Sequence, residues 1–191
     1  MVMIQVPLAM VTVLTVTIAL STPAAAGAQA SPAPEIAVTE AAGVYRVTAE
    51  FTVASAPGTV ASVLTDYERI PEFMPDVKTS QVVERNNAGL VVEQEAAAKF
   101  MMFSKRIHLV LDVSEDRGTI RFRDRCGKSF TQYEGAWRLN GRGDRTTVVY
   151  ELTAKPSFEV PAFVLKRLLK RDAFAMIDRL QAEILSRAPT R

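Results

Sequence analysis

The sequence predicts a single α+β domain in which a curved, seven-stranded antiparallel sheet wraps around a long C-terminal helix, with two short helices after the first strand. Residues 45–53 alternate between apolar and polar side chains, which is the pattern of a strand with one buried face. Between residues 77 and 156, further alternating segments are separated by turn-forming sequences. Residues 160–186 instead repeat apolar side chains at the three- and four-residue spacing of an amphipathic helix.

The length and composition agree with one globular domain. A chain of 191 residues can build one hydrophobic core but is short for two ordinary domains. Its residues are 48% hydrophobic and 23% charged, which is usual for a folded protein. The net charge of +2 is too small to predict a nucleic-acid partner, because such a partner requires a concentrated basic face.

The N-terminal segment has the composition of an export signal. Residues 1–30 contain no charged side chain, and residues 6–20 form an almost unbroken apolar run. The run has the length of a signal-peptide core and is short for a membrane span. Small residues follow it and offer cleavage after Ala26 or Ala28.

These features predict a signal peptide over residues 1–28, a linker over residues 29–42 and a folded domain over residues 43–191. The protein is therefore expected to be exported, either to the periplasm or out of the cell. No Lys or Arg precedes the apolar run, so an uncleaved N-terminal membrane anchor stays open as the alternative.

Two short helical segments are expected after the first strand. Pro57 suits the first turn of a helix, and Val60 and Val63 follow with helical spacing up to about Tyr67. The next segment, residues 70–75, contains two prolines and cannot stay helical for long. We expect a short second helix or a turn there.

Six more strands are expected between residues 77 and 156, joined as hairpins with one apolar face each. The opposite, solvent-facing side is expected to carry the only histidine, His108, and the arginines Arg121, Arg123 and Arg125. Because such a sheet needs a cover for its apolar face, and the C-terminal helix is the only element long enough, the helix is predicted to lie in the concave side of the sheet.

Several motifs occur in an order that resembles a known superfamily. They are the stretch Val63–Pro75, the strand residues Tyr133–Trp137 and the helix after Pro161. Together they resemble the START-like (SRPBCC) superfamily with its helix-grip fold, specifically the branch of polyketide cyclase/dehydrase-type and coenzyme Q-binding proteins. The resemblance covers residues 44–188 and implies a cavity between sheet and helix for a lipid, an isoprenoid quinone or another largely apolar molecule.

Inward positions of the strands and the apolar stripe of the helix supply candidate ligand-binding residues. Polar side chains in an apolar pocket orient a ligand, and they serve equally well as hydrogen-bonding groups of a core. Small inward residues, Ala49 and Gly135 among them, leave room for a ligand or simply let helix and sheet approach closely. The predicted lining is Gln94, Ala96, Ala98, Leu109, Phe122, Asp124, Tyr133, Trp137, Tyr150, Val164 and Leu168.

No pattern of residues predicts catalysis, a metal or a cofactor. Cys126 is the only cysteine, so an intramolecular disulfide is excluded, and it is expected to be a buried, inert thiol. The sequence contains no cysteine pair, histidine cluster or glycine-rich phosphate loop, and the single histidine offers no Ser-His-Asp set.

The favoured function is an exported carrier for a hydrophobic small molecule. The alternatives are a cyclase or dehydrase acting on a polyketide-like substrate, and a module that binds another protein. Four basic residues early in the last helix are expected to be solvated or to contact an anionic membrane surface transiently. They are Lys166, Arg167, Lys170 and Arg171.

Overall fold

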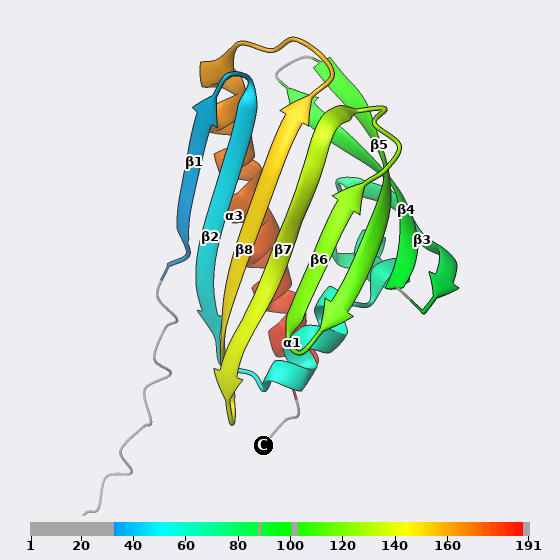
Figure 1. Ribbon diagram of the computed structural model, residues 1–191. Coiled ribbons are helices and arrows are strands. Elements are labelled where there is room, and N and C mark those ends of the chain that lie inside the picture. Colours follow the sequence, from blue (N-terminus) through cyan, green and yellow to red (C-terminus); the bar gives the residue numbers. More distant parts are fainter. Residues whose placement is uncertain (1–32, 88, 101–102, 189–191) are drawn as a thin grey trace, which may run out of the picture. The chain divides into compact units, whose positions relative to one another are not determined.

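The computed structural model describes residues 33–87, 89–100 and 103–188. The predicted signal peptide, and the membrane anchor that is its alternative, lie outside these residues. The described chain forms one antiparallel sheet that curves around a long C-terminal helix (Figure 1). The order of the strands across the sheet is β1-β2-β8-β7-β6-β5-β4-β3. The α+β helix-grip arrangement predicted from the sequence is therefore confirmed.

The strands are β1 (Glu35–Ala41), β2 (Val44–Val53), β3 (Val77–Asn86), β4 (Gly89–Phe100), β5 (Phe103–Asp116), β6 (Thr119–Asp124), β7 (Phe130–Arg142) and β8 (Arg145–Pro156). The helical elements are α1 (Pro57–Leu64), the short 3₁₀ helix η1 (Tyr67–Arg69), α2 (Ile70–Phe73) and α3 (Ala162–Ser186).

The sheet has eight strands instead of the seven expected, because β1 forms within the segment predicted to be a linker. β1 pairs with β2 through a tight turn at Ala42 and Gly43, both of which have positive φ angles. The carboxylate of Glu40 accepts a hydrogen bond from the Gly43 N–H at 2.9 Å. Ile36 and Val38 pack against the core, so β1 extends the covered surface of the sheet. The short helices consequently follow the second strand.

The apolar residues of the alternating pattern in the sequence form the inner face of the sheet. On β2, Tyr45, Val47, Ala49, Phe51 and Val53 are all buried. β8 lies beside β2 and contributes further buried residues in the same alternating pattern. Both strands therefore present one continuous apolar surface to α3.

α3 is buried along only part of its length. Its buried residues lie at helical spacing from the middle of the helix to its C-terminal end, and they are Ala173, Ile177, Leu180 and Ile184. The N-terminal turns are half-buried or exposed. Among the described residues no helix, α3 included, has both the length and the apolar character that crossing a membrane requires.

Gly135 on β7 provides a direct test of the packing. A Cβ at this position would lie 2.6 Å from the Phe122 ring and would also collide with the backbone oxygen of Glu151. Gly135→Ala is expected to lower the free energy of unfolding by about 1–3 kcal/mol, as overpacking does. Urea unfolding measures this change.

The matched control is Gly58→Ala, because Gly58 lies in α1 and a Cβ there meets nothing within 4 Å. This substitution is expected to leave stability unchanged or to raise it by up to about 1 kcal/mol. Equal effects of the two substitutions would contradict the packing of Phe122 over Gly135.

Candidate ligand-binding cavity

Two adjoining cavities lie between the inner face of the sheet and α3. The first, of about 280 Å³, is lined by residues of α1, η1, α2, strands β3 to β8, and α3 from Met176 to Leu180. The second, of about 550 Å³, is lined by residues of β2, β3, β4, β5, β7, β8, the segment after β8, and α3 from Leu165 to Arg179. Both have more apolar than polar lining, as ligand cavities usually do.

The cavities meet at a set of shared residues that we call the waist. The waist consists of Asp76, Val77, Gln94, Tyr133, Tyr150, Met176 and Arg179. It contains five of the nine charged, amide and phenol side chains of the two linings, and the walls on either side of it are mainly apolar. The interior therefore has a polar middle between two apolar ends.

Nine of the eleven sequence-predicted residues line these cavities. Phe122 and Trp137 line the first cavity. Gln94, Tyr133 and Tyr150 belong to the waist. The remaining four, which line the second cavity, are Ala96, Ala98, Leu109 and Leu168. The structure thus brings together residues from five strands and one helix that the sequence could only assign to inward faces.

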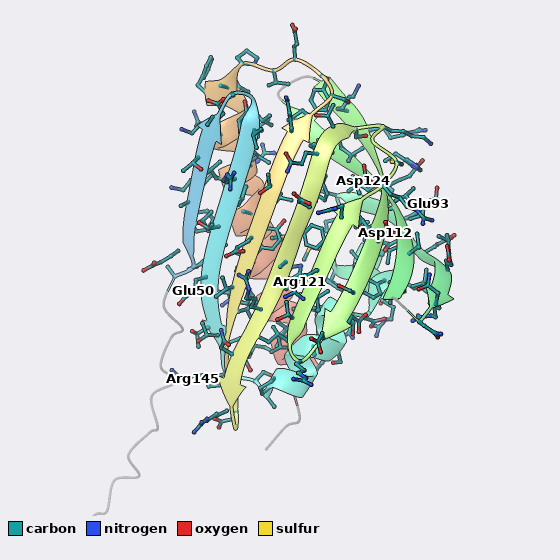
Figure 2. All side chains as sticks on the ribbon, viewed as in Figure 1. Glu50, Glu93, Asp112, Arg121, Asp124 and Arg145 are labelled. Atoms are coloured by element: carbon teal, nitrogen blue, oxygen red, sulfur yellow. The ribbon has the colours of Figure 1, made fainter. Side chains whose placement is uncertain are left out.

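Asp124 lies at the end of β6 and lines neither cavity. Its carboxylate accepts hydrogen bonds from the backbone N–H groups of Val110 at 2.8 Å, Gly127 at 3.0 Å and Cys126 at 3.3 Å. The bonds from Cys126 and Gly127 fix the turn that follows β6, and the bond from Val110 joins Asp124 to β5. Figure 2 labels Asp124. The alternation of the strand predicts an inward side chain, but the strand ends at this residue and the turn uses the carboxylate instead.

Val164 also lies outside both linings, although it is half-buried. Leu165, Leu168 and Leu169 face the second cavity instead. The helical spacing identified the correct stripe but placed its edge one residue too early.

Small inward residues have two different roles. Ala96 and Ala98 line the second cavity and leave space there. Ala49 is packed in the core at 2% exposure. The space above Gly135 is filled by the Phe122 ring. A small side chain at an inward position is therefore not enough to predict that the residue lines a cavity.

The waist also contains an ion pair that the sequence does not predict. Arg179 of α3 donates to Asp76 at 3.1 Å, which joins the helix to the segment before β3. The side chains are 36% and 52% exposed, so the pair lies at the rim of the waist. The only signal in the sequence is that Arg179 follows Met176 by three residues and so shares its side of the helix.

An aromatic cluster positions the two tyrosines of the waist. The ring of Tyr150 lies 4.2 Å from that of Trp137, its partner across β7 and β8. The ring of Tyr133 lies 4.9 Å from Phe130 and 5.9 Å from Phe122. Rings at these separations make favourable contacts, so the cluster holds both phenols in place.

Burial keeps both phenols protonated. Desolvation raises the pKa of Tyr133 to about 12, and the nearby charge of Asp124 adds to the shift. Burial also raises the pKa of Tyr150 well above its ordinary value, with a further contribution from Tyr133. At neutral pH both groups are therefore uncharged and can donate a hydrogen bond.

The opposite face of the sheet carries the charged residues. Figure 2 shows Glu93, Asp112 and Arg121 on the side turned away from α3, as the alternation predicts. His108 lies there between Glu93 at 3.8 Å and Glu95 at 3.9 Å. Its imidazole is 18% exposed, which is less than the solvent-facing prediction implied.

Cys126 is half-buried in the turn after β6. Its thiol lies 3.6 Å from the carboxylate of Asp124 and 3.8 Å from the backbone oxygen of His108. The thiol is therefore less buried than expected, and the linings of the two cavities do not include Cys126.

The fold and cavity define a helix-grip protein, and the sequence comparison assigns its family. Residues 53–181 match the family described as polyketide cyclase / dehydrase and lipid transport. The chain belongs to this START-like family. No curated protein matches it in sequence.

Solved structures with the same fold include proteins of different description. A START superfamily protein from Mycobacterium smegmatis is 20% identical with a TM-score of 0.65, and the match covers 74% of this chain and 97% of that one. The Zhui aromatase/cyclase from a Streptomyces species is 17% identical with a TM-score of 0.62, over 75% of this chain and 95% of that one.

A STAR-related lipid transfer protein from Xanthomonas axonopodis is 18% identical with a TM-score of 0.61, over 80% of this chain and 99% of that fragment. At these identities the comparisons support the shared fold alone.

The raised pKa of Tyr133 predicts a loss of stability in alkaline solution. Its folded pKa of about 12 exceeds the ordinary value of 10.0, so folding favours the neutral phenol. This contribution is fully present below pH 10 and is lost as the pH rises from 10 toward 12. The slope is about 1.4 kcal/mol per pH unit for one group.

Urea unfolding at about pH 9 and about pH 11 measures the effect, with Tyr133→Phe as the comparison. The variant is expected to lose about 1 kcal/mol less than the natural protein between these two conditions. Identical losses in both proteins would show that this phenol ionises as freely as an exposed one.

Proposed function

We propose that this protein is an exported carrier that encloses a hydrophobic small molecule, such as a lipid or an isoprenoid quinone-like compound, between its sheet and α3. The observation that carries the proposal is the pair of adjoining, mainly apolar cavities along α3. Membership of a family that includes lipid transport supports it.

Enclosure alone provides enough free energy for reversible carriage. Removing about 300 Å² of apolar ligand surface from water contributes roughly 7 kcal/mol at about 25 cal/mol per Å². The costs of immobilising the ligand and ordering the lining reduce this value. The remaining free energy is enough to hold a ligand and small enough to release it, as transfer between membranes requires.

Dye binding tests whether the cavities accept an apolar guest. The probe is N-phenyl-1-naphthylamine, whose fluorescence rises in an apolar environment. Ala96→Leu is expected to weaken its binding about tenfold, because the larger side chain enters the second cavity and displaces the dye.

The matched control is Ala182→Leu, which makes the same change at an exposed position of α3 outside both linings. It is expected to bind the dye as the natural protein does. No dye binding by the natural protein, or equal binding by both variants, would argue against the carrier.

We further propose that the carrier exchanges its ligand at an anionic membrane surface through Lys166, Arg167, Lys170 and Arg171. All four are exposed, and they lie on the half of α3 that lines the second cavity. Phe163, one turn earlier, is 77% exposed and adds an apolar contact. Each basic side chain near such a surface contributes about 1 kcal/mol.

Cosedimentation with vesicles tests this contact. Replacing Lys166, Arg167 and Lys170 by Glu is expected to abolish binding to vesicles of phosphatidylglycerol, while dye binding in the cavity is retained. Undiminished sedimentation, or sedimentation equal on phosphatidylcholine vesicles, would contradict an electrostatic contact.

Export is the part of the proposal that depends on residues 1–28. Their uncharged, apolar composition and the small residues at Ala26 and Ala28 support a cleaved signal peptide. Expression of the full chain in a Gram-negative host is expected to give a periplasmic protein whose mass corresponds to cleavage after one of these residues. A protein of full mass in the cytosol would contradict export.

A cyclase or dehydrase is the second candidate function, and the two phenols that line the waist favour it. In this case a poly-β-ketone substrate would turn over, and Tyr133→Phe would abolish the turnover. Asp124→Asn is a poor test of catalysis, because the Asp124 carboxylate accepts bonds from three backbone N–H groups.

A further inference from the structure

The two tyrosines of the waist differ from Tyr67 in the use of their hydroxyl groups. Tyr67 lines the first cavity and donates to the carboxylate of Glu115 at 2.8 Å. Tyr133 and Tyr150 have no hydrogen-bond partner for their hydroxyls anywhere in the described part of the chain. Two donors at the centre of a largely apolar interior are therefore unused by the protein itself.

Neither hydroxyl is sealed inside the protein. Of the described side-chain polar atoms that are fully shielded from solvent, only Ser55 Oγ and Arg187 Nη2 lack a partner. The hydroxyls of Tyr133 and Tyr150 are not among these atoms, and both residues line both cavities. A guest in the cavities can therefore reach these groups.

The other polar groups of the waist already have partners. The amide of Gln94 donates to Ser80 Oγ at 3.0 Å. Arg179 and Asp76 are paired with each other at the rim. An anionic guest would gain little from a guanidinium that is already neutralised, and burying its charge without a partner is costly. The waist therefore suits an uncharged guest.

A guest that is only hydrocarbon would leave both hydroxyls without a partner once water is displaced. An unsatisfied polar group costs more than the net gain from a typical hydrogen bond. A guest with an acceptor oxygen at the same depth would satisfy the phenols, because each phenol is an O–H donor. Apolar cavities on both sides of the waist require apolar groups on both sides of that oxygen.

From this geometry we infer that the ligand carries an uncharged acceptor oxygen, such as a ketone-type carbonyl, partway along an apolar body, and that Tyr133 and Tyr150 donate to it. This inference rests on the proposed function and specifies the ligand class. The two phenols are positioning groups that set how deeply the ligand enters each cavity.

Binding of three matched probes tests the inference. The probes are tridecane, 7-tridecanone with a central carbonyl, and 2-tridecanone with a terminal one. Trp137 is the only tryptophan and lines the first cavity, so its fluorescence reports occupancy without a label. The natural protein is expected to bind 7-tridecanone more tightly than either other probe.

Tyr133→Phe and Tyr150→Phe are each expected to weaken binding of 7-tridecanone about two- to tenfold, the range expected for one net hydrogen bond. Binding of tridecane should stay unchanged or improve. Thr52→Val is the control, because it removes a hydroxyl that pairs with Thr147 and lines neither cavity. It should leave the preference for the ketone unaltered.

The outcomes separate this inference from the proposed function. Equal binding of all three probes by the natural protein would overturn the inference and leave the carrier intact. Equal weakening of ketone and alkane binding in the phenylalanine variants would overturn it as well, because the phenols would then only shape the cavity. Absence of binding by every probe would overturn both proposals.

Discussion

The attachment of the C-terminal half of α3 to the sheet is the constraint on which the cavities depend. Ile177, Leu180 and Ile184 are buried against the inner face and fix this half of the helix. Just beyond the helix, Arg187 donates to Asp66 at 2.7 Å and to Glu183 at 2.6 Å, which ties the end of α3 to the segment before η1. The N-terminal half has no comparable set of buried residues, so it spans the sheet and leaves the larger cavity beneath it.

The difference in burial between the two halves of α3 also explains where the ligand is expected to enter and leave. Regions with few buried apolar contacts open at lower free energy than the core of a domain. The basic side chains and Phe163 are carried by the same, less buried half of α3. A membrane contact on that half would therefore act on the part of the protein that can move without disrupting the buried half.

The waist determines what kind of chemistry the interior favours. Its phenols are held protonated by burial, which makes them hydrogen-bond donors and poor general bases at neutral pH. Its one ion pair is internally neutralised. These properties favour hydrogen bonding to a neutral oxygen over abstraction of a proton.

The sequence predicted most of the fold because alternation and helical spacing report directly on burial. It missed β1, whose alternation is short and follows an Ala- and Pro-rich stretch typical of a linker. It predicted an inward side chain for Asp124, but the alternation of faces holds only until the strand ends. There the carboxylate accepts hydrogen bonds from the backbone N–H groups of Val110 on β5 and Gly127 in the following turn. The pairing of Asp76 with Arg179 joins residues about a hundred positions apart, so only the assembled fold reveals it.

Native mass spectrometry of the gently purified protein, followed by extraction into organic solvent, tests the central claim most directly. A carrier is expected to give a species heavier than the polypeptide by one small, mainly apolar molecule, which is then recovered from the extract. A protein of polypeptide mass alone, with nothing recovered and no uptake of apolar guests when they are offered, would contradict it.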